Sequence, residues 1–251
     1  MRYVFETYPP STYPKLYPKP IEYYEKARRN YRILNLFILL AGLLILAVLL
    51  GYSRSGEWDH AIAMWYFLVQ FFPLMLLDLS SLKEFKLMRN ANSRTTRKAE
   101  LHPRRLFDFI SPTIISMAII TYVGFVLLIL YIRQFEFPWF GGYWNIVGVT
   151  AINICFAGII LRYMYGKKLN PHQAYEDRIR HIETIVKVLV FTSIAATMFI
   201  AINVVLAALD LRNLQPIAQS LYFQLLAVIC FQAYRIDYTN FEVYKEDPLV
   251  A

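Results

Sequence analysis

Residues 112–132 read PTIISMAIITYVGFVLLILYI, a continuous apolar stretch without a charged side chain. An α-helix rises 1.5 Å per residue, so about 20 residues cross the roughly 30 Å of hydrocarbon in a bilayer. Few soluble proteins contain an uncharged apolar run of this length. The stretch therefore predicts a membrane-spanning helix from Pro112 to Ile132.

Five other stretches of the chain have a similar length and hydropathy. They are Ile33–Tyr52, Ala61–Leu79, Ile146–Tyr165, Ile185–Leu209 and Ile217–Tyr234. The composition agrees, because 57% of the 251 residues are hydrophobic and only 18% are charged, which is unlike a soluble domain. We expect an all-α polytopic membrane protein with six transmembrane helices.

The six helices would occupy residues 33–234. Residues 1–32 would form a cytoplasmic arm rich in proline and tyrosine, ending in an interfacial helix, and residues 235–251 a cytoplasmic tail. The arm reads as an extended, polyproline-like segment or as a poorly ordered one, and no cleavable signal is evident. Cys155 and Cys230 lie inside apolar runs, which favours packing roles over a disulfide.

The basic residues alternate from one connection to the next. Seven lie in residues 1–32, eight in 83–105 and four in 167–180, whereas the three other connections carry only Arg54, Arg133 and Arg212. Short loops rich in Lys and Arg stay cytoplasmic. We expect a multi-pass protein of the cell (inner) membrane, with both termini on the cytoplasmic side. The net charge of +8 then reflects topology, and no nucleic-acid partner is expected.

One pattern recurs before each odd-numbered span: a proline, an aromatic residue four positions later, and then an acid. Its three copies are Pro20/Tyr24/Glu25, Pro103/Phe107/Asp108 and Pro171/Tyr175/Glu176. Proline favours the first turn of a helix, and Asn170 is a good N-cap residue. The pattern predicts helix starts at these points and three helical hairpins around a pseudo-threefold axis.

Polar side chains inside the spans are the candidates for a substrate path. They are Gln70, Asn153, Asn203, Gln224 and Gln232, and Pro73 is added because it would kink the second span. An unpaired amide in hydrocarbon is costly, so each should face a neighbouring helix or a wet cavity. Hydrogen bonding between helices, which fixes their register, is the alternative for each of them.

Histidines and acids predicted on the cytoplasmic face are the candidates for an enzyme site. They are Asp78, His102, Asp108, His172, Glu176 and His181. Their spacing argues against catalysis, because His172 and His181 would lie on opposite faces of one helix, and no HxxxH, HExxH or CxxC motif occurs. We therefore expect no catalytic residue, metal or cofactor.

Three functions remain open. A small-molecule or lipid carrier or binder, with a cavity between hairpins, is favoured by the span amides and points to transport. A non-catalytic membrane subunit or scaffold would bind protein partners, or further copies of itself, through the aromatic arm and basic loops. An intramembrane enzyme using the His and acid groups is least expected. Anionic lipid headgroups are the expected contact of the segment from Lys83 to Arg105.

Overall fold

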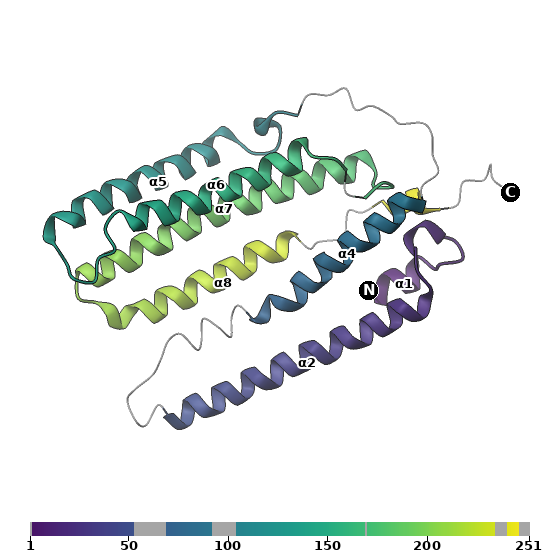
Figure 1. Ribbon diagram of the computed structural model, residues 1–251, viewed down its shortest axis with the longest axis horizontal. Helices are drawn as coiled ribbons and strands as arrows, with labels where there is room; N and C mark the ends of the chain where they lie inside the picture. The colour runs from purple at the N-terminus through teal and green to yellow at the C-terminus, as the bar shows by residue number, and fades with distance from the viewer. Residues whose placement is uncertain (1, 53–68, 92–103, 169, 234–239, 246–251) are drawn as a thin grey trace. The chain divides into compact units, whose positions relative to one another are not determined.

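The computed structural model describes residues 2–52, 69–91, 104–168, 170–233 and 240–245, and every regular element in these ranges is a helix (Figure 1). The chain divides into two compact units. The first unit comprises residues 1–97, 168–173 and 240–251, and the second comprises 98–167 and 174–239. His102 and residues 61–68 of the expected second span lie outside the described residues.

The described residues of the first unit contain three α-helices and two 3-10 turns. These are α1 (Arg2–Thr7), η1 (Pro14–Leu16), α2 (Ile21–Tyr52), α4 (Phe72–Ala91) and η5 (Phe241–Tyr244). The helix α2 is continuous, so the expected interfacial helix and the first span form one element. Helical structure at Val69 and Gln70 is interrupted at Phe71, and α4 begins at the next residue with the buried Pro73 in its first turn. Proline is accepted there because the backbone N–H that it lacks would be unpaired in a first turn.

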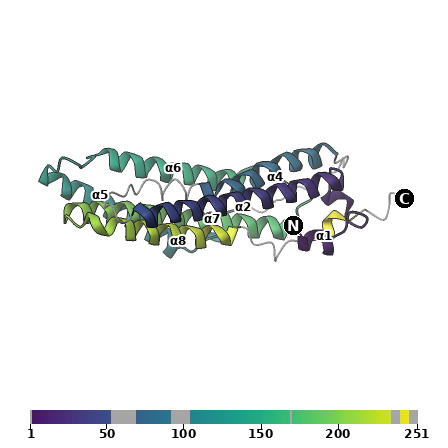
Figure 2. The same ribbon diagram turned by 90° about the horizontal axis from the view of Figure 1, so that it is seen from below.

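In the second unit, the part that the structure describes contains four long helices and three 3-10 turns. These are η2 (Leu106–Asp108), α5 (Pro112–Ile132), η3 (Arg133–Phe135), α6 (Trp144–Tyr165), α7 (Tyr175–Ala208), η4 (Arg212–Leu214) and α8 (Gln215–Ala233). The helices run roughly along one common direction in both views (Figure 1, Figure 2). Their centre is α7, which packs against α5, α6 and α8.

Three helical stretches in the described residues are long and apolar enough to cross a membrane: Pro112–Phe135, Trp144–Tyr165 and Tyr175–Ala208. These are the helices of a membrane protein, in agreement with the class expected from the sequence. The bounds of α5 coincide with those predicted for the third span. By contrast, α7 begins ten residues before the predicted start at Ile185. The prediction followed the apolar stretch alone, whereas the helix also includes the polar turns that precede it.

Two apolar clusters hold the second unit together. One lies near the start of α7, where Ile182, Val186 and Val190 form a buried stripe at intervals of four residues. The other lies near the opposite end of the helices and includes Phe125 and Ile129 of α5. The stripe on α7 explains why this helix, rather than α5 or α6, is the centre of the unit.

The three copies of the proline pattern do not share one local structure. The first is followed directly by α2, but the second is followed by η2, and α5 begins later with Ser111 as its N-cap and Pro112 in its first turn. The expectation that Asn170 caps the third helix is wrong. Ala174 occupies that position, and the Asn170 carboxamide oxygen accepts a hydrogen bond from the His172 backbone N–H (3.0 Å) instead.

Candidate functional site

An aromatic cluster in the first unit gathers residues from both ends of the chain. Its members, which we call the aromatic cap, are Phe5, Tyr8, Tyr13, Tyr17, Tyr24, Phe241 and Tyr244. Ring contacts join them into two groups, and a hydrogen bond from the Tyr17 hydroxyl to the Tyr8 carbonyl oxygen (2.7 Å) connects the groups. The ring centroids of Tyr8 and Phe241 lie 4.1 Å apart in a stacked arrangement. Tyr13, Tyr24 and Tyr244 are each more than nine-tenths buried. The cap is therefore a small packed core within the first unit.

Polar contacts also join the two ends of the chain within the cap. The Tyr13 hydroxyl donates a hydrogen bond to Glu242 Oε1 (3.0 Å), and Lys245 forms an ion pair with the same carboxylate. Hydrogen bonds from Lys245 and Tyr13 lower the pKa of Glu242, because both stabilise its charged form. Burial raises the pKa of the Tyr13 hydroxyl, and its hydrogen bond to Glu242 acts in the same direction.

A third segment, residues 168–173, contributes to the same unit. The Asn170 carboxamide donates a hydrogen bond to the Tyr244 hydroxyl, and the His172 ring lies edge-on to the Tyr244 ring with centroids 6.1 Å apart. On the other side of the segment, Arg89 of α4 donates a hydrogen bond to the Lys168 carbonyl oxygen (2.9 Å). The N-terminal arm, the loop between α6 and α7 and the C-terminal tail thus meet in one place.

The arm is not the extended segment that its prolines predicted. Residues 2–7 are helical, η1 turns the chain at Pro14, and Tyr13 and Tyr17 have backbone angles outside the polyproline region. The tyrosine rings between the prolines explain the difference. Packing against one another and against the tail removes their apolar surface from water, which an extended arm would not do.

Charged groups lie where α2 approaches α4, beside the cap. The Lys19 ammonium lies over the Tyr23 ring, 3.7 Å from its centroid. Burial raises the pKa of Glu84, and the positive charge of Lys19 opposes this shift. The Tyr24 hydroxyl is buried without a hydrogen-bond partner among the described residues, and burial together with the Glu84 charge raises its pKa.

Polar side chains also pair in the middle of the second unit. The hydroxyls of Tyr122 on α5 and Thr150 on α6 lie 2.6 Å apart, and Ser193 on α7 donates a hydrogen bond to Asn153 Oδ1 (2.7 Å). Thr150 and Asn153 are three residues apart on α6 and so lie on the same face. We call these four residues the mid-helix polar seam, which connects three apolar helices.

The other predicted amides have local contacts. Asn203 donates a hydrogen bond to the Phe199 carbonyl oxygen one turn earlier (2.8 Å), and the exposed Gln224 contacts the Ser220 hydroxyl on the same helix (3.4 Å). Gln70 is exposed in the first unit, and Gln232 lies in α8. Among the predicted amides whose side chains the structure describes, Asn153 is thus the one that hydrogen-bonds to a neighbouring helix.

The predicted histidine and acid residues are divided between the units. Asp78 and His172 belong to the first unit, and Asp108, Glu176 and His181 to the second. Asp108 accepts a hydrogen bond from the Arg105 backbone N–H (2.8 Å), which fixes the turn before α5. No group of three or more His, Cys, Asp or Glu side chains that could hold a metal ion occurs in the part of the chain that the structure describes.

Basic side chains close the end of α6 that lies near the start of α7. Arg104 donates a hydrogen bond to the Met164 carbonyl oxygen, and Arg178 donates one to the Gly166 carbonyl oxygen, each at 2.8 Å. Cations are favourable at a helix C-terminus, where carbonyl groups lack partners within the helix. Part of the basic charge predicted to contact lipid headgroups therefore stabilises a helix end.

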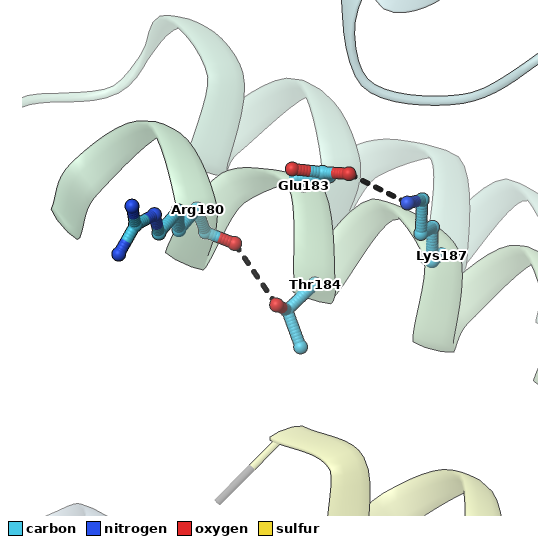
Figure 3. A network of polar contacts seen from close by, with 4 residues as sticks. All are labelled: Arg180, Glu183, Thr184 and Lys187. Atoms are coloured by element: carbon cyan, nitrogen blue, oxygen red, sulfur yellow. Dashed lines mark hydrogen bonds and ion pairs between the residues drawn. The ribbon is translucent and has the colours of Figure 1, made fainter. Parts of the chain in front are cut away.

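The first turns of α7 carry their own ion pair. Lys187 contacts Glu183 at 2.5 Å, one turn away, and the Thr184 hydroxyl donates a hydrogen bond to the Arg180 carbonyl oxygen (Figure 3). Both members of the ion pair are about two-fifths exposed, so it contributes little to stability. These residues form a solvated helix surface rather than a reactive site.

Sequence reasoning missed the tail side of the cap and three members of the polar seam. Phe241 and Tyr244 follow the last apolar stretch in a short polar tail, where no periodic pattern marks them as buried. Tyr122, Thr150 and Ser193 are common in membrane helices, and hydroxyl groups also bond to their own helix, as Thr150 does to Ile146. The position of the facing helix alone distinguishes a hydroxyl that bonds between helices from one that bonds to its own helix.

Comparison with family models, with curated proteins and with solved structures found no match to the chain.

Proposed function

We propose that this protein is a non-catalytic subunit or scaffold of the cell membrane, which crosses the bilayer six times and binds a protein partner through its cytoplasmic aromatic cap. The observation that carries the proposal is the cap itself. Three segments far apart in the sequence, residues 2–20, 168–173 and 240–245, contribute to one folded unit.

The cap supports six spans by a parity argument. Segments that touch one another lie on the same side of the membrane, so the chain crosses it an even number of times between each pair of them. Two helices, α7 and α8, separate the loop at 168–173 from the tail. The expected first four spans separate the arm from that loop, and the basic residues in the arm place this side in the cytoplasm.

Partner binding fits the exposed edge of the cap. Ile21 and Tyr23, in the first turn of α2, are 43% and 41% exposed, although they adjoin the buried Tyr24. Tyrosine is prominent among residues that dominate protein interfaces, because it combines a large apolar face with a hydroxyl group. A rigid cap that presents such residues loses little entropy when a partner binds.

A carrier remains the second candidate because of the mid-helix polar seam. Hydroxyl and amide groups in the middle of apolar helices can line a path for a polar solute. In the structure these groups pair with one another, which equally gives the helices a fixed register. Because these polar groups already pair with one another, we rank the subunit hypothesis above the carrier hypothesis.

Site-specific photo-cross-linking in cells tests the proposal. A photoreactive phenylalanine analogue at position 23 should capture one partner, and the same probe at Tyr175 should not. Tyr175 is a matched control, since it is 45% exposed and also lies in the first turn of a helix. The captured protein should form a stoichiometric complex with the purified wild-type chain and should be lost with Phe241→Ala. Identical capture at both positions would reject the cap as a binding surface.

A second measurement separates the two candidate functions. Asn153→Leu and Ser193→Ala remove the inter-helix hydrogen bond of the seam without touching the cap. A subunit should keep its partner when either substitution is made. If these variants instead abolish solute uptake while the Tyr23 cross-link is unchanged, the carrier hypothesis replaces the subunit.

A further inference from the structure

Two arginines occupy the end of the second unit that is formed by the connections α5–α6 and α7–α8. Arg133 directly follows α5, and Arg212 begins η4. Each guanidinium group lies over an aromatic ring: Arg133 Cζ is 3.9 Å from the centroid of Tyr143, and Arg212 Cζ is 5.5 Å from that of Trp139. Both connections lie at the same end of the helices in Figure 1.

The surface that carries these arginines is built into the fold. Phe137 and Phe140 of the α5–α6 loop pack against the apolar cluster at this end, and the Phe137 ring stacks on Trp139 at 5.2 Å. The contact of Arg212 with Trp139 then joins the α7–α8 turn to the same loop. Trp139, which contacts Arg212, thus belongs to an aromatic framework packed on the apolar cluster, and Tyr143, which contacts Arg133, lies in the same connection directly before α6.

Neither arginine is neutralised by a carboxylate in the part of the chain that the structure describes. Glu136 and Asp210 are close in sequence, but each occupies a left-handed backbone position in its turn, with φ of 49° and 58°. Both arginines are exposed. A guanidinium group stacked on a ring keeps its N–H donors free in its own plane, and these donors match the oxygens of a phosphate group.

The surroundings have the character of a membrane interface. Tyr143 and Trp144 are 50% and 78% exposed, and aromatic residues of this kind favour the headgroup layer. Along the helices from there, Tyr131 and Val147 expose apolar surface that suits an acyl chain. The anion present in quantity at this depth is the phosphate of a phospholipid.

We infer that Arg133 with Tyr143 and Arg212 with Trp139 form a binding site for the phosphate headgroup of a phospholipid, in the leaflet that faces this end of the second unit. The site goes beyond the proposed partner binding and does not use the cap. It depends only on the crossing of the membrane by the helices of the second unit. A bound headgroup would contact both the α5–α6 and the α7–α8 connections and would restrain the ends of these four helices.

The test uses the purified full-length chain in a neutral detergent, with a short-chain phosphatidylglycerol as the probe. Native mass spectrometry should show one retained lipid, and the lipid should raise the melting temperature. The double variant Arg133→Gln/Arg212→Gln should weaken binding at least about tenfold, since loss of a charge-assisted hydrogen bond has roughly that effect. Arg180→Gln is the matched control and should bind as the wild type does, because Arg180 is exposed and lies near the start of α7, at the opposite end of that helix from Arg212.

Other outcomes overturn the inference. Equal losses with the double variant and with Arg180→Gln would indicate non-specific attraction to a basic protein. Equal stabilisation by inorganic phosphate would indicate a site for the free anion. Tyr143→Leu is a second variant, in case the double variant misfolds, and it keeps both arginine charges. It should weaken retention of the lipid while the far-ultraviolet circular dichroism spectrum stays unchanged. Full retention in that variant and in the double variant would exclude the site, whatever the cross-linking at Tyr23 shows.

Discussion

Gly166 ends α6 at a point where the backbone leaves no room for a side chain. A Cβ atom there would lie 2.1 Å from the Arg162 carbonyl oxygen, a backbone atom that accepts the hydrogen bond from the Gly166 N–H at 2.8 Å. The Gly166 carbonyl oxygen in turn accepts a hydrogen bond from Arg178. This glycine thus lets the chain leave α6 while Arg178 of α7 caps its end.

Gly166→Ala should therefore destabilise the protein by about 1–3 kcal/mol, the usual cost of forcing extra atoms into a packed site. Thermal unfolding in lipid nanodiscs measures the effect. Gly158→Ala is the matched control, because a Cβ at Gly158 meets no atom within 4 Å. Equal melting temperatures for the two variants would show that the end of α6 adjusts without cost.

The Asn153–Ser193 hydrogen bond should couple α6 to α7. A double-mutant cycle with Asn153→Leu and Ser193→Ala should give a coupling energy of about 0.6 kcal/mol, typical of hydrogen bonds between membrane helices. Unfolding in mixed micelles supplies the four stabilities. A cycle that pairs Ser193→Ala with Gln224→Leu should give no coupling, because Gln224 bonds within α8. Coupling of similar size in both cycles would contradict this assignment.

At the scale of elements, the shortest ones join the chain ends. The turn η5 is only four residues long, yet Tyr244 is buried and Phe241 stacks on Tyr8. A short 3-10 turn has little stability of its own. Its order therefore depends on contacts with the arm and with Asn170, and weakening those contacts should release the tail before any long helix unfolds.

Docking of the tail should depend on pH through Glu242. Because the folded state lowers the pKa of this carboxyl, its contribution is complete above the usual value of 4.5 and is lost as the pH falls through the lowered pKa. Hydrogen exchange at residues 240–245, compared at equal intrinsic exchange rates, should show weaker protection in acid. Tyr13→Phe should reduce this dependence, and Glu22→Gln, on an exposed part of α2, should leave it unchanged. Protection that is independent of pH would rule out the Glu242 contact.

At the scale of the whole molecule, the cap limits how the chain threads through a membrane. In the proposed topology, the arm, the α6–α7 loop and the tail share one side of the membrane, and one helix separates each of the α5–α6 and α7–α8 connections from that side. The basic residues of the arm favour the cytoplasm for that side. The charge distribution and the contacts of the cap are thus consistent with the same proposed topology.

Labelling of single cysteines tests that topology. In intact cells, an impermeant maleimide should label Gln134→Cys and Asn213→Cys, but should label Glu25→Cys and Arg105→Cys only after the membrane is opened. Cys155 and Cys230 are first replaced by serine to remove the background. Labelling of Glu25→Cys from outside would show that the orientation is the reverse of the proposed one. If only one of Glu25→Cys and Arg105→Cys were labelled from outside, the chain would cross the membrane an odd number of times between them, which contradicts the proposed first two spans.

Prediction from sequence succeeded best where one helix decides the outcome. The bounds of α5 follow from an uncharged run with Ser111 and Pro112 at its start. It was less successful where two elements decide jointly: Asn170 has the chemistry of an N-cap residue but bonds to His172 and Tyr244. Among the amides, composition could not separate Asn153, which faces Ser193, from Gln224, which does not bond to another helix.

The membrane class of this protein was fixed by local properties of the sequence: the length of each apolar run relative to bilayer thickness, and the avoidance of charge in hydrocarbon. Tertiary structure alone decided that Tyr8 meets Phe241, that Tyr122 meets Thr150 and that Trp139 meets Arg212. These pairs are remote in sequence or lie on different helices. They form through complementary shape and hydrogen bonding between surfaces, which no periodicity along a single segment encodes.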